Sequence, residues 1–178
     1  MEQGLEHIFD ENTCVIIMGT FPSIQSRGEC YYNHPQNQFW KIMAEICHNE
    51  KVINGNRDVR YRCLLSKGVG LWDVIQSCAF ERKSSLDSKI IKSSIVYNDF
   101  SLLRTKCPNL KCIVFSSGNA CKLYKRYLRQ DVPEEMRSWL NVMTNNGQNV
   151  LPSTSPANAR HRPEEKLKEW KDFFQSIL

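Results

Sequence analysis

Short apolar runs alternate with amphipathic segments along most of the chain. Residues 13–19 (TCVIIMG) form a continuous apolar run that is rich in β-branched side chains and ends in glycine. This composition is typical of a strand buried on both faces, as in parallel sheets. Residues 69–75 (VGLWDVI) and 111–118 (KCIVFSSG) repeat the pattern, and residues 149–151 make a shorter run of the same kind. We therefore predict four strands.

The segments between these runs carry apolar residues at helical spacing. In the clearest of them, Phe39, Trp40 and Met43 share one face. Asn37 is placed to cap its first turn. Further helices are predicted over residues 58–66, 100–106 and 119–130, and from Pro163 onward. The alternation predicts an α/β fold: a three-layer sandwich with a central, mostly parallel four-stranded sheet flanked by helices.

Ligands of such sheets bind beyond the carboxyl ends of the strands. The loops expected at that edge follow Met18, Phe115 and Leu151. The first of them lacks the glycine-rich patterns of dinucleotide sites and phosphate-binding loops. It contains Phe21 and Tyr32, whose flat rings offer surfaces on which a planar base can stack.

The loop after Leu151 is rich in hydroxyl groups and proline. Ser153 and Ser155 lie between two prolines, and Asn158 and Arg160 follow them. Hydroxyls and exposed amides, with cations at the rim, suit phosphate oxygens. Without further context, however, this segment is also an ordinary turn.

Composition narrows the class of protein. At 178 residues the chain is predicted to form one domain over residues 1–178. No apolar run approaches the length of a membrane span, and the acidic N-terminus does not resemble a secretory signal, so we expect an intracellular protein. The eight cysteines are scattered without a CxxC pair, which predicts free thiols and no metal site. The net charge of +5 favours a polyanionic partner.

Four segments together resemble the uracil-DNA glycosylase superfamily, and most closely its hypoxanthine-DNA (deoxyinosine) glycosylase branch. They are GTFPS at residues 19–23, YYNHPQNQFW at 31–40, GLWDVI at 70–75 and LPSTSPANA at 151–159. The resemblance implies a monomeric DNA repair enzyme that flips a deaminated base out of DNA and hydrolyses its N-glycosidic bond, leaving an abasic site. Hypoxanthine is the expected base, with uracil and xanthine as further candidates. The resemblance implies no cofactor or metal.

The resemblance also implies roles for individual residues. Asn37 matches the asparagine of the HPxN element, to which catalysis is attributed in the deoxyinosine branch. Thr20 departs from the mismatch-specific enzymes, which carry a water-positioning asparagine there. The residues expected around the base are Gly19, Thr20, Phe21 and Tyr32, and those expected on the DNA are Ser153, Ser155, Ala157, Asn158 and Arg160. Asp73 is a second candidate for activating water.

Simpler interpretations stay open beside these. Asn37 can be a helix cap alone, and Tyr31 and Tyr32 can be core aromatics. The cationic stripe on the helix over residues 119–130 (Lys122, Lys125, Arg126 and Arg129) is either a solvated face or a phosphate contact. The alternative functions are a non-catalytic α/β module that binds nucleotide or nucleic acid, and a flavin-binding reductase.

Overall fold

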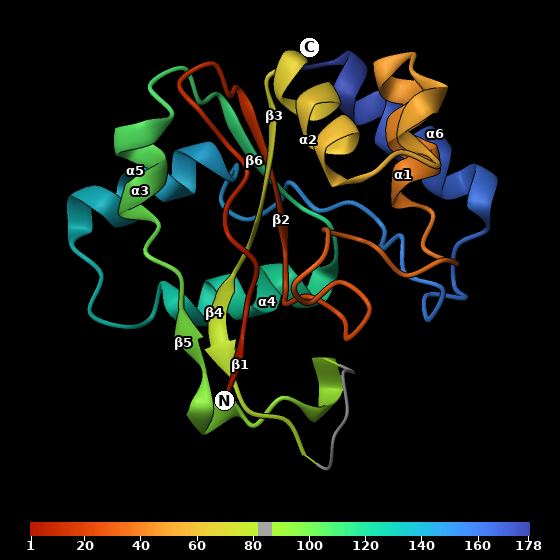
Figure 1. The fold of residues 1–178 in the computed structure, drawn as a ribbon. Coiled ribbons are helices and arrows are strands. Elements are labelled where there is room, and N and C mark those ends of the chain that lie inside the picture. The colour runs from red at the N-terminus through yellow and green to blue at the C-terminus, as the bar shows by residue number, and fades with distance from the viewer. Residues whose placement is uncertain (82–86) are drawn as a thin grey trace.

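Three parallel strands form the centre of the protein (Figure 1). The structure is a computed structural model, and it describes residues 1–81 and 87–178. Strands β2 (Val15–Gly19), β3 (Val69–Asp73) and β6 (Cys112–Phe115) lie in the order β3-β2-β6. Every residue of the three strands is buried, as their continuous apolar sequences predict. These three predicted strands and their parallel pairing are confirmed.

The prediction of a fourth parallel strand is wrong. Residues 149–151 make only an isolated parallel bridge, between Val150 and Phe115. The Phe115 N–H donates to the Asn149 carbonyl at 2.9 Å, and the Leu151 N–H donates to the Phe115 carbonyl at 2.8 Å. The pairing does not extend beyond this bridge, and the chain turns into the loop after Leu151.

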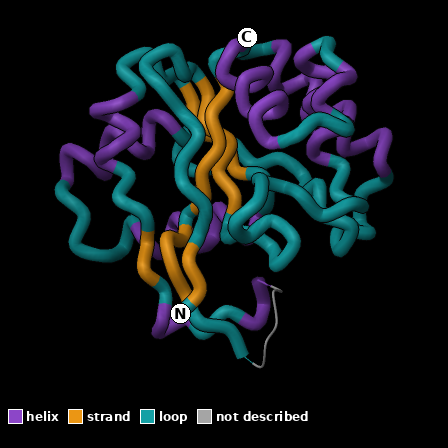
Figure 2. The backbone as a smooth tube through the Cα atoms, in the orientation of Figure 1, coloured by secondary structure: helices purple, strands orange, loops and turns teal. Residues whose placement is uncertain are grey.

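A second, antiparallel sheet was not predicted. It consists of β1 (Glu2–Gln3), β4 (Ile75–Cys78) and β5 (Val96–Tyr97) in the order β1-β4-β5. The apolar run 69–75 therefore does not form one strand: β3 ends at Asp73, and β4 leaves for the other sheet after Val74. Figure 2 shows the antiparallel strands below the central sheet, beside the N-terminus.

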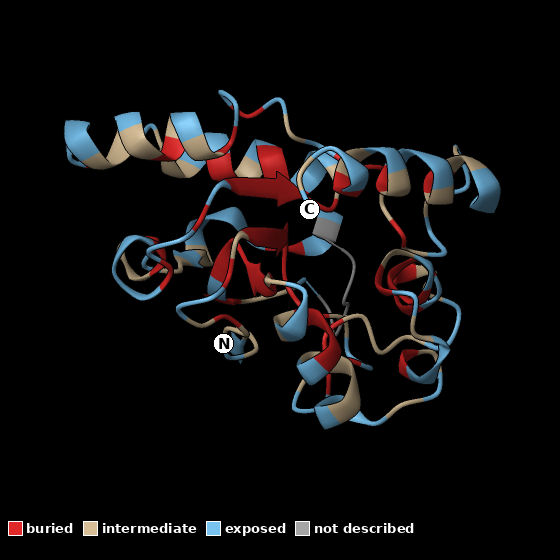
Figure 3. Cartoon of the chain, turned by 90° about the horizontal axis from the view of Figure 1, so that it is seen from above, coloured by how far each residue is buried: buried red, intermediate tan, exposed pale blue. Residues whose placement is uncertain are grey.

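Helices cover both faces of the central sheet. The predicted helices correspond to α1 (Phe39–Cys47), α2 (Arg57–Ser66), α3 (Ser101–Lys106), α4 (Gly118–Tyr127) and α6 (Pro163–Gln175). Helix α5 (Glu134–Met143) was not predicted. Three short 3-10 helices, η1 (Glu50–Val52), η2 (Asp87–Lys89) and η3 (Lys92–Ser94), lie in the connections. In Figure 3 the buried strands lie between helices whose outer surfaces are exposed. No helix within residues 1–81 and 87–178 is long and apolar enough to cross a membrane.

Alternate residues of β2 divide the core into two halves. Val15 and Ile17 join a cluster with α1, α2 and α6, whereas Ile16 and Met18 join a cluster with α3, α4 and α5. This alternation follows from the two-residue period of a strand and gives the three layers that the sequence predicts.

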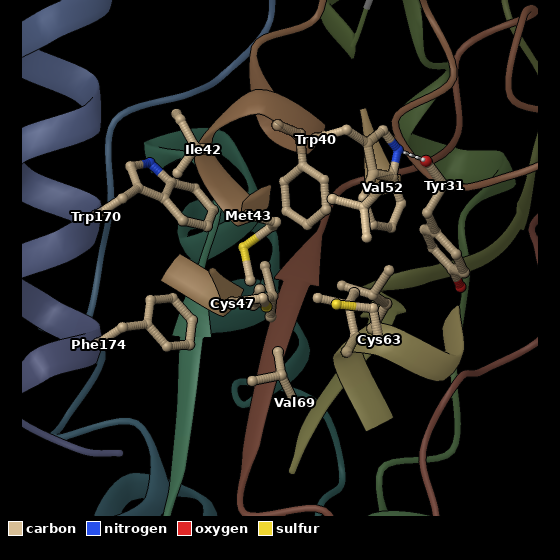
Figure 4. Packing of buried hydrophobic residues seen from close by; sticks show 14 of the residues in the cluster. Tyr31, Trp40, Ile42, Met43, Cys47, Val52, Cys63, Val69, Trp170 and Phe174 are labelled. Atoms are coloured by element: carbon tan, nitrogen blue, oxygen red, sulfur yellow. Dashed lines mark hydrogen bonds between the residues drawn. The ribbon is translucent and has the colours of Figure 1, made fainter. Parts of the chain in front are cut away.

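Tryptophan side chains connect this core to the loops at the strand ends (Figure 4). The Trp40 Nε1–H donates to the Tyr31 carbonyl at 2.9 Å. On α6, the Trp170 Nε1–H donates to the Pro152 carbonyl at 3.0 Å. Each of the two loops that carry predicted site residues is thus fixed to the hydrophobic core by a buried hydrogen bond.

Candidate active site

A cavity of about 470 Å³ lies at the carboxyl ends of the parallel strands. Loops that follow β2 and β6 line it, together with the segment after Leu151. Their convergence was predicted from the parallel order of the strands. Every predicted site residue except Arg160 lines this cavity: Gly19, Thr20, Phe21, Tyr32, Asn37, Ser153, Ser155, Ala157 and Asn158.

Gly19 lets the two central strand ends meet without a side chain between them. It pairs in register with Asp73 on the neighbouring strand. A Cβ added at Gly19 would collide with Asp73 Oδ1 and would lie 3.3 Å from the Tyr32 hydroxyl. The space beside the Gly19 α-carbon is therefore occupied by the Asp73 carboxylate and the Tyr32 hydroxyl.

Tyr32 is held in one orientation. Its ring stacks on Phe39 of α1, with the ring centroids 3.8 Å apart and the planes 15° from parallel. Its hydroxyl donates to Ser116 Oγ at 3.0 Å. Because Phe39 covers one face of the ring, only the opposite face is left for a base to stack on. The backbone of Tyr32 has φ +56°, a left-handed conformation that costs on the order of 1–3 kcal/mol and is found at functional sites.

Asn37 lies where the loop enters α1. Its Oδ1 accepts the Phe39 N–H at 3.0 Å, so the side chain satisfies a free donor of the first helical turn. The N-cap residue itself is Gln38, one position later than predicted. Gln38 donates its N–H to the Thr154 carbonyl at 3.0 Å, which ties the start of α1 to the loop after Leu151. Asn37 therefore both supports the helix and lines the cavity.

Internal hydrogen bonds shape the Ser/Pro loop, residues 152–158. The Ser155 N–H donates to Ser153 Oγ at 3.3 Å, and the Ala157 N–H donates to Ser155 Oγ at 3.2 Å. The Asn158 side-chain amide donates to the Ser153 carbonyl at 3.0 Å. These bonds fix hydroxyl and amide groups along the rim of the cavity, an arrangement that suits an anion.

Lys166 supports this loop through hydrogen bonds to its main chain, and no role was predicted for it from the sequence. It projects from α6, and only 4% of the residue is exposed. Its ammonium donates to the Asn158 carbonyl at 2.9 Å and to the Ser155 carbonyl at 3.5 Å. Burial lowers the pKa of this lysine. Its position four residues before the buried Trp170, on the inner face of α6, was the available signal.

Asp73 brings a carboxylate to the cavity. It is the last residue of β3, and only 4% of it is exposed. The Asn98 side-chain amide donates to its main-chain carbonyl at 2.8 Å. A carboxylate is seldom buried unless hydrogen bonds or charges compensate for its desolvation, and such groups in a cleft mark functional sites. Ser116 and Ser117, from the loop after β6, and Asn119, at the start of α4, also line the cavity, although no role was predicted for them from the sequence.

Arg160 lies apart from the cavity, whereas Tyr31 lines it but is almost wholly buried. Arg160 lines a second hollow of about 380 Å³, which shares Ser153 and Asn158 with the first. Tyr31 is 3% exposed, and its hydroxyl donates to the Glu6 carbonyl at 3.0 Å. Burial raises the pKa of Tyr31 well above its usual value, and the negative charge of Asp73 adds to the effect.

The cysteines do not form a site. All eight carry free thiols, and seven of them are buried. Burial raises the pKa of Cys107 and of Cys112 to about 11, so both are protonated near neutral pH. Among residues 1–81 and 87–178 there is no group of three or more His, Cys, Asp or Glu side chains that could hold a metal ion.

The fold and the cavity together define an α/β protein whose cavity, at the carboxyl ends of the parallel strands, is lined by aromatic, hydroxyl and amide side chains. The chain belongs to the uracil DNA glycosylase superfamily, whose sequence profile matches residues 6–178. The family identified from the four sequence segments is thereby confirmed.

Two relatives are named Hypoxanthine DNA glycosylase. The protein from Methanosarcina barkeri is 36% identical over 129 residues, which cover 72% of this chain and 78% of the relative. The protein from Methanosarcina acetivorans is 32% identical over 176 residues, or 98% and 99% of the two chains. A solution NMR structure of a Methanosarcina acetivorans protein, described as a putative uracil DNA glycosylase, superposes with a TM-score of 0.72 at 30% identity, covering 99% of this chain and 98% of the other.

Proposed function

We propose that this protein is a DNA glycosylase that releases hypoxanthine from deoxyinosine in DNA, with uracil and xanthine as further candidate bases. The observation that carries the proposal is the cavity at the strand ends, which brings Tyr32, Asn37 and the Ser/Pro loop together. The names of the two Methanosarcina relatives support the choice of hypoxanthine. A base inside a duplex is out of reach of such a cavity, so the nucleotide must be flipped out, which costs a few kcal/mol.

The proposed reaction is a hydrolysis at C1′ of the deoxyribose. The bond from C1′ to N9 breaks, and its electron pair leaves with the base. Water adds to C1′, one of its protons is lost, and the base takes up one proton. The protein must therefore orient water and stabilise positive charge on the sugar, tasks that need geometry rather than a strong base.

Asn37 is suited to both tasks. An amide oxygen has two lone pairs, and the Phe39 N–H uses one of them. The other is available for water or for the electron-poor sugar. Because the helix already fixes the amide, little reorganisation is needed when the substrate arrives. The cap interaction and the catalytic role therefore support each other in this proposal.

We assign the base to the open face of Tyr32. Main-chain amides can meet its polar edge, since the N–H groups of Thr20 and Phe21 make no backbone hydrogen bond in the described part of the chain. Donors at this position also stabilise negative charge on the departing base. Ser153, Ser155, Ala157 and Asn158 would contact the flanking DNA backbone, and Arg160 would extend that contact into the second hollow.

Release of free base from an oligonucleotide with one deoxyinosine tests the function. We expect Asn37→Ala to lower the single-turnover rate about 100-fold to 1000-fold, with little change in DNA affinity. Gln36→Ala is the matched control, because Gln36 is exposed and is not among the residues lining the cavity. Deoxyuridine and deoxyxanthosine substrates establish the base preference.

A non-catalytic nucleic-acid-binding module is the second candidate. The hydrogen bond from the Phe39 N–H to Asn37 Oδ1 favours it, since support of the first helical turn alone explains that residue. In this case the protein would bind DNA without releasing any base, and Asn37→Ala would reduce only its stability, by about 1 kcal/mol.

A further inference from the structure

The loop after β2 carries an exposed apolar side chain at the edge of the cavity. Ser23 and Ser26 line the cavity, and Ile24, which follows Ser23, is 52% exposed. Among the large apolar side chains exposed in residues 1–81 and 87–178, Ile24 alone has cavity-lining residues within two positions on both sides. Isolated exposed apolar residues are common in proteins, so the argument depends on this position and on the structure of the turn.

The turn that carries Ile24 is fixed by its own hydrogen bonds. The N–H groups of Ser26 and Arg27 both donate to the Ser23 carbonyl, at 2.9 and 3.1 Å. The Ser23 and Ser26 hydroxyls bond to each other at 3.1 Å, and the Asn33 N–H donates to Ser26 Oγ at 3.0 Å. Little conformational freedom is therefore left for this turn to lose when it meets a ligand.

Arg27 anchors the same turn to a neighbouring part of the protein. Its Nε–H donates to the Pro22 carbonyl at 3.3 Å, and its guanidinium pairs with Glu2 of β1 at 3.1 Å. The guanidinium also lies over the rings of Phe21 and Phe80, at 5.4 and 4.8 Å from their centroids. The antiparallel sheet thus supports the turn, and the apolar tip can press on a ligand without the loop yielding.

The Ser/Pro loop borders the same cavity with small and polar side chains. Its exposed residues are Pro156 and Ala157, and neither side chain reaches as far from the backbone as that of isoleucine. A nucleotide that is flipped out of a duplex leaves a gap between its neighbours. Proteins that unstack bases insert apolar side chains, isoleucine among them, between the base steps. Of the two loops, the one after β2 carries the side chain suited to this role.

We infer that Ile24 enters the base stack of duplex DNA and occupies the gap that the flipped deoxyinosine leaves. This inference rests on the glycosylase function proposed above. The side chain would act on the opening of the duplex and not on the cleavage of the N-glycosidic bond. Its loss should therefore affect a paired and stacked deoxyinosine far more than one in a single strand.

The experiment measures single-turnover release of hypoxanthine from one deoxyinosine oligonucleotide, as a single strand and in a duplex. We expect Ile24→Ala to slow release from the duplex at least about tenfold and release from the single strand less than about threefold. Ile24→Leu keeps the volume of the side chain and should restore most of the duplex rate. Val142→Ala is the matched control, since Val142 is 73% exposed on α5 and is not among the residues lining the cavity.

Fluorescence of 2-aminopurine next to the deoxyinosine reports unstacking directly. The duplex is titrated with protein in the Asn37→Ala background, so that the base is not released during the measurement. We expect saturating protein to raise the fluorescence, and the added Ile24→Ala substitution to reduce this rise at least about twofold. The added Ile24→Leu substitution should leave the rise nearly unchanged.

Several outcomes would overturn the role of Ile24. Equal slowing of the two substrates by Ile24→Ala would mean that the residue does not act on the duplex, and an unchanged duplex rate would mean that it is not needed. A duplex-specific loss in Pro156→Ala alone would assign the role to the Ser/Pro loop. Release by the wild-type protein from single strands only would show that it opens no duplex. Failure to release hypoxanthine from either substrate would instead overturn the glycosylase function itself.

Discussion

At the scale of single residues, the absence of a side chain at Gly19 is a requirement of the site. We expect Gly19→Ala to displace Asp73, because the new methyl group collides with its carboxylate. Overpacking of this kind costs about 1–3 kcal/mol, and base release should fall at least about tenfold. Thermal unfolding and single-turnover release measure the two effects.

Gly118→Ala is the matched control for this substitution. An added Cβ at Gly118 meets no atom within 4 Å, and the residue begins a helix, where alanine is favoured. The free energy of unfolding of the Gly118→Ala variant should be unchanged or slightly higher. If Gly19→Ala behaves like this control, the close approach of the two strand ends is not required by the site.

Sequence patterns located some of these residues better than others. The loops of parallel strands must converge, so Asn37 in the loop after β2 and Ser153 in the loop after Leu151 could be predicted to share a site. The stacking of Tyr32 on Phe39 could not be predicted, because it depends on a left-handed turn at Tyr32 that no local pattern signals. Arg160 was predicted with the Ser/Pro loop, yet lines the neighbouring hollow.

At the scale of elements, α6 supports the Ser/Pro loop through Lys166. We expect Lys166→Met to remove the donor for the Ser155 and Asn158 carbonyls while keeping the length and apolar contacts of the side chain. The loop should then lose its fixed shape, and the Kd for DNA should rise about tenfold. The single-turnover rate of base release at saturating protein should change much less, because the substitution does not touch Asn37.

The control is Lys168→Met, on the same helix. Lys168 is exposed and pairs with Asp172 at 2.5 Å, away from the loop. The DNA affinity of the Lys168→Met variant should match that of the wild-type protein. Equal losses of affinity in the two variants would mean that α6 contributes general positive charge rather than support for the loop.

The elements that were missed have different explanations. Helix α5 could have been predicted, since Met136, Trp139, Leu140 and Met143 follow helical spacing after Pro133. Strands β1 and β5 could not, because two residues are too few to show any period. Their pairing with β4 depends on contacts that are distant in the sequence.

At the scale of the whole molecule, the placement of charge limits where DNA can lie. The net charge is +5, and the exposed cations of α4 contribute to it. Helix α4 begins with Gly118 beside the second hollow and leads away from it. At a rise of about 1.5 Å per residue, Arg126 lies roughly 12 Å along the axis from Gly118. That separation exceeds the screening length of about 8 Å at physiological salt.

This placement predicts unequal roles for two arginines. Arg160→Ala should lower the slope of log Kd against log salt by about 0.9, the loss of one phosphate contact, because Arg160 lines the hollow next to the cavity. Arg126→Ala should leave the slope unchanged. Titration of an oligonucleotide with one deoxyinosine at several salt concentrations measures both. A lower slope for Arg126→Ala would mean that the bound strand runs along α4, and the cationic stripe would then be a phosphate contact rather than a solvated face.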